Sequence, residues 1–354
     1  MSGTSADGID AALVDFSQAA PQLIDFLTHP INYQDQLNQI NQTASVNLND
    51  LSKLHRQIGE HFAHAAQALI QKTGLSSSKI AAIGSHGQTI FHAPHHGMSL
   101  QIGHPAIIAK QTGITTAADF RIDDIALGGQ GAPLAPAFHR ALLKPTKTTC
   151  VINIGGISNL TILHQNGQVT GYDTGPGNAL MDEICQQYFN QPYDREGAIA
   201  AQANTDQALL QTLLQHRYFK QTAPKSTGRE TFNQTWLTQQ INGRSIDPKH
   251  LISTLNQLTV ETLAQSLETH QLSPGTECYI CGGGALNQTL LHRLQKRLPN
   301  LNIHSIQQLG FDPNAIEAMM CAWLAKQRLE NIPVDLTHTT GSSRPAILGG
   351  IWQP

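Results

Sequence analysis

The sequence carries few charged residues. They make up 13% of its 354 residues, about half of the usual share of ~25%. Its 22 basic and 25 acidic residues leave a formal net charge of −3, and no basic run stands out. The electrostatic footprint of nucleic-acid binding is therefore missing, and we expect no nucleic-acid partner.

Long apolar runs are missing as well. No stretch approaches the roughly 20 apolar residues that span a bilayer, and the N-terminus has no basic-then-apolar signal pattern. The five cysteines are an odd number scattered through apolar stretches, which favours reduced, intracellular thiols. We therefore expect a cytoplasmic protein with no membrane partner.

Several common catalytic signatures do not occur. There is no Gly-x-x-x-x-Gly-Lys-[Ser/Thr] phosphate loop, since Pro-Lys-Ser at 224–226 lacks the upstream glycines. Residues 83–87 resemble the nucleophile elbow of a hydrolase, but an isoleucine stands in place of its first glycine. Cys278 and Cys281 would face opposite sides of an expected strand, which argues against a zinc site. A serine hydrolase built on Ser85 stays open as an alternative.

The chain is long for a single hydrophobic core, so two domains are expected. Strand-like and helix-like stretches alternate along it, which indicates an α/β fold. A long amphipathic helix is predicted at residues 49–73. A Gly/Pro cluster at 128–136 marks the expected boundary, and the alternation restarts at residues 149–154.

The first ten residues, Met-Ser-Gly-Thr-Ser-Ala-Asp-Gly-Ile-Asp, place two glycines and several hydroxyls ahead of an expected strand. Such a loop lets backbone N–H groups approach an anion closely. Ser2, Thr4 and Ser5 add hydroxyl donors, and Asp7 could hold a metal-bound water. An ordinary polar terminus has the same composition, and composition alone favours that interpretation.

Two further glycine turns lie in the second half. Residues 153–161 read as strand, Gly-Gly turn and strand, which predicts a hairpin that either approaches phosphate or is purely structural. Residues 171–178 end a strand and open a helix, the place where open α/β sheets bind ligands. The only carboxylate of that turn, Asp173, is well placed as a general base. The alternative is that Asp173 or Asn178 merely caps the helix.

A triple glycine at 282–284 follows a buried strand and precedes a helix. It either leaves a surface for a flat adenine ring or allows tight strand–helix packing. In the first half, three polar loops end or follow expected strands and are either structural or ligand-binding. The side chains that they offer to a polar ligand are His86, Gln88, Asp119, Arg121 and Gln130.

Taken in order, these motifs resemble those of the anhydro-N-acetylmuramic acid kinase family. They are Met-Ser-Gly-Thr-Ser-x-Asp-Gly, Ser-His-Gly-Gln-Thr, Ala-Asp-Phe-Arg, Gly-Gly-Gln-Gly-Ala-Pro-Leu-x-Pro, Asn-Ile-Gly-Gly, Asp-Thr-Gly-Pro-Gly-Asn and Cys-Gly-Gly-Gly. Pro-Lys-Ser-Thr-Gly-Arg-Glu at 224–230 fits the same family. Each motif is weak alone, but the ordered set spans nearly the whole chain and is highly specific.

The resemblance implies the two-domain, actin-like (ribonuclease H-like) α/β fold of sugar kinases. Residues 1–135 with 340–354 would form the N-terminal domain and 136–339 the C-terminal domain, with ATP and sugar in the cleft between them. A homodimer is also implied. In the family a strand precedes the first motif, whereas Met1 begins inside it. We therefore expect either that this first N-terminal strand is lacking or that the true start lies upstream.

The cofactors that the resemblance implies are ATP and Mg²⁺, with the metal bridging phosphate oxygens. The nucleotide would contact the first motif, the Gly-Gly hairpin and the triple glycine. By residue, these contacts are Gly3, Thr4, Ser5, Ala6, Asp7, Gly8, Ile9, Asp10, Gly155, Gly156, Asn159, Gly282, Gly283 and Gly284.

The implied substrate is a small sugar of peptidoglycan turnover, 1,6-anhydro-N-acetylmuramic acid. The implied reaction opens the anhydro bridge with water and phosphorylates O6, giving N-acetylmuramic acid 6-phosphate. Asp173 matches the family's catalytic aspartate and would take a proton from the attacking water, as in an inverting glycosidase.

The expected sugar contacts are Gln88, Asp119, Arg121, Gln130, Asn178 and Glu317. Among them, Arg121 is the candidate for the lactyl carboxylate, because guanidinium suits bidentate binding. An alternative of a different class is an actin-like ATPase or binding module that uses ATP as a conformational switch.

Overall fold

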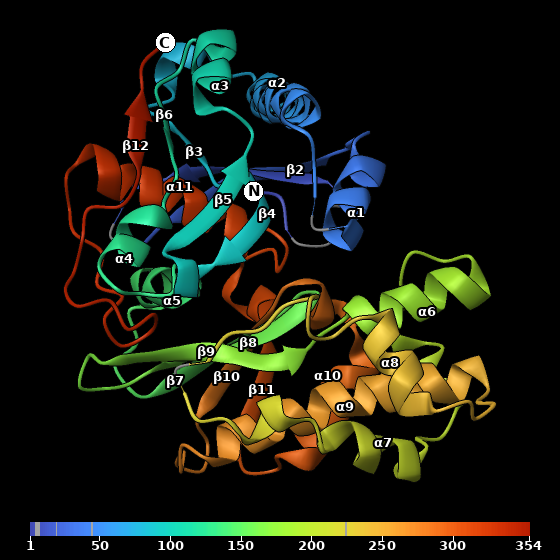
Figure 1. The fold of residues 1–354 in the computed structure, drawn as a ribbon. Helices are drawn as coiled ribbons and strands as arrows, with labels where there is room; N and C mark the ends of the chain where they lie inside the picture. Colours follow the sequence, from blue (N-terminus) through green and yellow to red (C-terminus); the bar gives the residue numbers. More distant parts are fainter. Residues whose placement is uncertain (4–7, 19, 44, 224) are drawn as a thin grey trace. The chain divides into compact units, whose positions relative to one another are not determined.

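The computed structural model describes residues 1–3, 8–18, 20–43, 45–223 and 225–354 (Figure 1). Backbone contacts divide the chain into two compact units. Unit 1 comprises Met1–Lys144 and Asn314–Pro354, and unit 2 comprises Pro145–Pro313. Both units combine strands with helices, so the expected mixed α/β class is confirmed. No helix in the described ranges has the length and apolar character needed to cross a membrane.

The limits of the units lie elsewhere than the sequence suggested. Helix α5 (Ala135–Leu143) is part of unit 1, and the chain returns to unit 1 at Asn314 rather than at residue 340. The return is earlier because helix α11 (Ile316–Leu329) packs on strands of unit 1. At Gly84 a Cβ would lie 1.9 Å from the carbonyl oxygen of Cys321, so only glycine allows this approach of strand and helix.

Unit 1 holds three small sheets within the described ranges. β1 (Ile9–Asp15) pairs antiparallel with β2 (Gln22–His29), and β4 (Gln88–Ala93) pairs antiparallel with β5 (Met98–Ile102). The third sheet has the order β12 (Gly350–Trp352), β6 (Thr116–Ala118) and β3 (Ile83–Ser85). The remaining helices of this unit are α1 (Gln34–Thr43), α2 (Leu48–Thr73), α3 (Pro105–Thr112) and α4 (Ile122–Ala126).

The first residue belongs to the architecture of unit 1. Met1 and Asp10 exchange two backbone hydrogen bonds of 2.7 and 2.8 Å. Since Asp10 uses both of its backbone groups in this exchange, Met1 lies along the edge of β1 that faces away from β2. The amphipathic helix α2 buries Leu54, Ile58 and Phe62 in the same apolar cluster as Ile9, which fixes the start of β1.

Unit 2 is built on a five-stranded sheet of order β11-β10-β7-β8-β9. β7 (Thr149–Ile154), β8 (Ile157–Leu163) and β9 (Val169–Pro176) form an antiparallel meander. β10 (Glu277–Cys281) is parallel to β7, and β11 (Asn302–Ser305) is parallel to β10. A three-stranded meander extended on its first strand by two parallel strands is the ribonuclease H-like topology, so this part of the predicted fold class is confirmed.

Helices pack against this sheet and complete one apolar core. The longest, α9 (Pro248–Glu268), contacts β8 and β9 and buries residues such as Leu255, Leu258 and Leu263 (Figure 1). The other helices of unit 2 are α6 (Ala179–Phe189), α7 (Gln207–Leu214), α8 (Gln234–Ile241) and α10 (Gln288–Arg297). Strand β7 is buried along its whole length, and β10 becomes fully buried towards its end, which gives the loops that follow a well-packed base.

Candidate functional site

A row of polar side chains crosses the sheet of unit 2 where its glycine turns begin. The strand register pairs Asp173 with Asn159, Asn159 with Asn153, and Asn153 with Cys281. Directly paired residues on neighbouring strands point to the same face of a sheet. The predicted base therefore lies on the same face as the predicted nucleotide contact Asn159, one strand away.

Three hydrogen bonds hold Asp173 from outside the sheet. The backbone N–H of Thr227 donates to the carboxylate Oδ2 of Asp173 at 3.0 Å. The Tyr218 hydroxyl donates to the Asp173 carbonyl at 2.6 Å, and the Asp173 N–H donates to the carbonyl of Lys225 at 3.2 Å. Asp173 lies inside β9, so the alternative that it caps a helix is wrong.

The negative charge of Asp173 shifts the pKa values of two neighbouring side chains. Burial raises the pKa of the Tyr218 hydroxyl, and the charge of Asp173 raises it further. Burial lowers the pKa of the Lys225 ammonium, and Asp173 opposes that shift. Sequence reasoning assigned neither residue to the site, because each lies more than forty positions from Asp173.

Two buried oxygen atoms beside Asp173 lack hydrogen-bond partners within the described ranges. They are Oδ1 of Asn159, on the adjacent strand, and Oγ1 of Thr227, whose N–H binds the carboxylate. Buried polar atoms in proteins are nearly always paired, and exceptions call for an explanation such as a ligand. These two oxygens are the observation that makes this row of residues a candidate binding site.

The Gly-Gly hairpin and the start of α6 are joined by backbone contacts. The N–H of Asn178 donates to the Gly155 carbonyl at 2.8 Å, and its side-chain amide donates to the Ile154 carbonyl at 3.1 Å. A Cβ at Gly177 would lie 2.3 Å from the Gly155 oxygen, so the approach requires glycine. Asn178 occupies the N-cap position of α6, as one interpretation of the sequence predicted, but its side chain makes no capping bond to the helix.

The triple glycine makes the tight strand–helix packing that was one interpretation of the sequence, and it leaves its middle residue exposed. Gly282 and Gly284 pack tightly, since added Cβ atoms would lie 2.3 Å from Asn153 Oδ1 and 2.4 Å from Ile154 Cγ2. A Cβ at Gly283 would meet just the side-chain nitrogen of Asn178, at 3.6 Å. Gly283 therefore presents open backbone next to the hairpin, as a flat ligand requires.

In unit 1, the guanidinium of Arg121 is built into the loops around it. Its Nε donates to Nε2 of His86 at 2.9 Å, and its NH1 donates to the Gly131 carbonyl at 2.8 Å. Because Nε2 of His86 accepts, the ring proton lies on Nδ1, 3.1 Å from the Gly87 carbonyl. Burial, followed by the charge of Arg121, lowers the pKa of His86 well below its usual value, so the imidazole is neutral.

The polar loop at 128–131 is organised by a carboxylate that sequence reasoning missed. Asp124 is buried, and its two oxygens accept from the Gly131 N–H and the Thr340 hydroxyl, both at 2.7 Å. The Gln130 N–H binds the Thr340 carbonyl at 3.0 Å. The signal was present as two adjacent aspartates ahead of the glycine cluster, but such a pair usually lies on the surface.

The other predicted sugar contacts of unit 1 differ in their burial and in their hydrogen-bond partners. Gln88 is buried; its amide donates to the Gly3 carbonyl at 3.3 Å, while its Oε1 has no partner among the described residues. Asp119 is exposed with a φ of +62°, and partial burial of its carboxyl together with Asp123 raises its pKa. Glu317 lies in the first turn of α11.

The predicted first phosphate loop is described only at its ends. Thr4, Ser5, Ala6 and Asp7 lie outside the described residues. At the ends, the Ser2 hydroxyl donates to the Gly8 carbonyl at 3.0 Å, and the Thr28 hydroxyl donates to the Asp10 carboxylate at 2.6 Å.

The structure offers no support for a serine hydrolase in the described ranges. The Ser85 hydroxyl is buried without a hydrogen-bond partner there, and the adjacent imidazole of His86 is bound to Arg121. A serine nucleophile needs a base within hydrogen-bond reach. No cluster of three or more histidine, cysteine or acidic side chains suited to a metal occurs in the same ranges.

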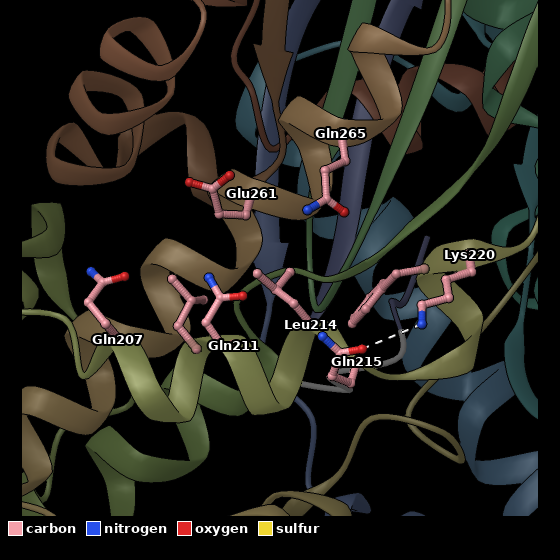
Figure 2. A pocket seen from close by; sticks show the side chains of 9 residues that line it. Gln207, Gln211, Leu214, Gln215, Lys220, Glu261 and Gln265 are labelled. Carbon is pink, nitrogen blue, oxygen red and sulfur yellow. Dashed lines mark hydrogen bonds between the residues drawn. The ribbon is translucent and has the colours of Figure 1, made fainter.

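A pocket of about 410 Å³ also lies in unit 2, away from the predicted site residues. Figure 2 shows Gln207 and Gln211 on α7 and Gln215 directly after it, with Glu261 and Gln265 contributed by α9. Lys220, at the end of the short helix η5 (Arg217–Lys220), donates to Gln215 at 3.4 Å. No residue of the Asp173 row lines this pocket.

The profile of a family described as anhydro-N-acetylmuramic acid kinase matches residues 1–354. The chain belongs to this family. Two relatives carry the same name: one from Hydrogenovibrio crunogenus is 52% identical, covering 100% of this chain and 97% of its own. The other, from Saccharophagus degradans, is 47% identical, with 100% and 98% covered. The resemblance drawn from the motifs is therefore confirmed over the full length.

A more distant likeness exists among solved structures. The activator of 2-hydroxyisocaproyl-CoA dehydratase from Clostridium difficile, solved with bound ADPNP, aligns with 91% of this chain and 96% of its own. Its TM-score is 0.46 and its identity 9%. The fold assignment rests on the strand order of unit 2 and not on this likeness.

Proposed function

We propose that this protein is an ATP-dependent kinase that converts 1,6-anhydro-N-acetylmuramic acid and water to N-acetylmuramic acid 6-phosphate. Membership of the family supports the reaction class. The single structural observation that carries the proposal is Asp173, a carboxylate held by Thr227 and flanked by two unpartnered buried oxygens. The proposal includes the family's setting, a cytoplasmic homodimer that recycles cell-wall amino sugar.

Asp173 acts in the proposal as a general base. Its carboxylate takes a proton from a water molecule that attacks the anomeric carbon of the sugar. The bond between that carbon and O6 breaks, and the freed O6 takes the γ-phosphoryl group of ATP, which leaves ADP. The new carbon–oxygen bond replaces the broken one, and the proton on Asp173 is later released to solvent.

The nucleotide is assigned to the glycine turns around this row. Backbone at Gly155 and Gly156 would bind phosphate, and Gly282–Gly284 would border the adenosine, supported by the open face of Gly283. Asn159 would bind from β8 through its unpartnered oxygen. The proposal adds Gly3, Gly8, Ile9 and Asp10 from the first motif, with Thr4–Asp7 outside the described residues.

A Mg²⁺ ion would be bound largely through phosphate oxygens and water, which is how this ion commonly binds and needs no preformed protein cluster. When bound, it neutralises charge on the transferring phosphoryl group.

Recognition of the sugar is assigned to Asn178 and to polar residues of unit 1. These are Gln88, Asp119, Arg121, Gln130 and Glu317. His86 and Gly131 accept hydrogen bonds from the guanidinium of Arg121 and fix its orientation. A substrate carboxylate would therefore bind N–H donors that are already in position. The unpartnered Oε1 of Gln88 supports a polar ligand near this side chain.

The direct test is to incubate the purified protein with ATP, Mg²⁺ and the anhydro sugar. The expected products are ADP and a ring-opened sugar phosphate in equal amounts, with ADP formation dependent on the sugar. Slow ATP hydrolysis at a rate that does not depend on the sugar would instead support an ATPase that acts as a conformational switch, and would reject the kinase.

A further inference from the structure

The segment Lys225–Glu230 belongs to a distinctive sequence motif, yet the proposed reaction gives it no role. In the structure it lies beside β9 and binds one residue twice. The carbonyl of Lys225 accepts from the Asp173 N–H, and the N–H of Thr227 donates to the Asp173 carboxylate. Residues 225–227 therefore contact both the backbone and the carboxylate of the proposed base.

Lys225 is an unusual residue for this place because its side chain is only 9% exposed. Its Nζ lies 4.8 Å from the ring centroid of Tyr218 and 5.7 Å from that of Tyr172, and donates to the Tyr218 carbonyl at 3.4 Å. No carboxylate of the described residues forms an ion pair with it. A buried ammonium that is held by aromatic faces but not ion-paired is costly, and an apolar side chain of equal length would pack there without that cost.

Tyr218 connects the lysine back to the base. Its hydroxyl donates to the carbonyl of Asp173 at 2.6 Å, while its ring and its own carbonyl contact the ammonium of Lys225. The three residues thus form a closed set of contacts between η5, β9 and the 225–227 segment. Tyr218 and Lys225 therefore both hold the backbone of Asp173, from which the carboxylate projects.

We propose that residues 225–227 are a positioning strap for the general base, and that Lys225 anchors the strap and places a positive charge near the Asp173 carboxylate. The proposal rests on the function assigned above. Lys225 acts through Asp173, so it is a positioning residue.

The direction of the pH effect follows from the charges around Asp173. Titratable groups near it include Lys225 on the strap, Tyr218 on η5 and Tyr172 on β9 itself; Glu230 interacts with Tyr218. A positive charge beside a carboxylate lowers the pKa of that carboxylate. Removal of the lysine charge therefore raises the pKa of Asp173 and moves the acid limb of the pH–rate profile to higher pH.

The experiment compares Lys225→Met, which keeps chain length without charge, with Lys225→Arg, which keeps the charge. For Lys225→Met we expect kcat to fall about 100-fold and the acid limb of kcat to rise by about one pH unit. Lys225→Arg should lose rate but keep the wild-type acid limb, and KM for ATP should stay within about twofold in both. The matched control is Lys220→Met, an exposed lysine of the same region, which should behave as wild type.

A wild-type rate and acid limb in Lys225→Met would overturn the proposal. Equal rate losses in both variants with an unmoved acid limb would also overturn it, because Lys225 would then only fill space. If Lys225→Met does not fold, Tyr218→Phe removes one hydroxyl and should lower kcat about tenfold; an unchanged kcat there would reject the strap.

Titration of the Asp173 carboxyl by carbon-13 NMR, without substrate, separates this proposal from the proposed function. The strap predicts a higher carboxyl pKa in Lys225→Met than in wild type whatever sugar the enzyme uses. Equal values in the two proteins would contradict the strap even in an active kinase. A missing sugar phosphate product in the wild type would contradict the function alone.

Discussion

The two units hold their polar residues in different ways. In unit 2, the carboxylate of Asp173 is positioned by distant backbone groups, and buried oxygens of Asn159 and Thr227 beside it remain unpartnered within the described ranges. In unit 1, Arg121 and Asp124 each make two hydrogen bonds that tie loops together. Substitutions in the unit 2 row should therefore reduce the rate at constant stability, whereas those in unit 1 should reduce both.

The largest effect is expected for Asp173→Asn. The amide oxygen can still accept from Thr227, so folding and ATP affinity should hold, but an amide cannot take a proton. We expect kcat to fall by about 10³, within the range for loss of a general base. Steady-state kinetics and calorimetric ATP binding measure the two quantities. The control is Asp15→Asn, an exposed carboxylate that binds Ser17; a loss below about tenfold at Asp173 would exclude it as the base.

Arg121→Met tests the other half of the comparison. The substitution leaves Nε2 of His86 and the Gly131 carbonyl without their donor. We expect the free energy of unfolding to fall by about 2–4 kcal/mol, as for unpaired buried groups, together with a higher KM for the sugar. Urea denaturation and sugar titration measure these effects. Unchanged stability would show that the guanidinium has no structural role and acts in ligand binding alone.

Acid should weaken unit 1 through its buried histidine His139. Burial lowers the pKa of His139 to about 3, below the ordinary 6.5. Its neutral form stabilises the fold fully above pH 6.5, and this contribution is lost as pH falls towards the folded-state pKa. For His139 alone the loss is about 2 kcal/mol at pH 5. Hydrogen exchange at pH 7 and 5 should show falling protection around α5; equal protection would contradict the assignment.

Two neighbouring glycines sharpen the comparison within unit 2. Gly284→Ala places a Cβ against Ile154 and should cost about 1–2 kcal/mol of stability through over-packing. Gly283→Ala has open space around it and should leave stability unchanged while weakening ATP binding. Thermal unfolding and ATP titration of both variants measure the difference. If the two substitutions changed stability equally and ATP affinity equally, the triple glycine would not be part of the nucleotide site.

The features that sequence predicted best were local ones. Strand–glycine–helix patterns located the connection between β9 and α6, and the ordered motifs identified the family. The strap could not be predicted, because Lys225 and Thr227 lie more than fifty residues from Asp173 in the sequence. A hydrophobic pattern indicates helices and strands, but it does not indicate which distant loop contacts them. That α11 belongs to unit 1 was not predicted for the same reason, since it depends on packing against strands far away in sequence.

The central claim is that Asp173 activates water against the anomeric carbon of the sugar. The most direct measurement runs the reaction in ¹⁸O-labelled water and locates the label in the product by mass spectrometry. The account predicts one ¹⁸O atom on the anomeric carbon and none in the phosphate. Label in the phosphate would contradict it, because water would then have attacked phosphorus and Asp173 would not be the base for ring opening.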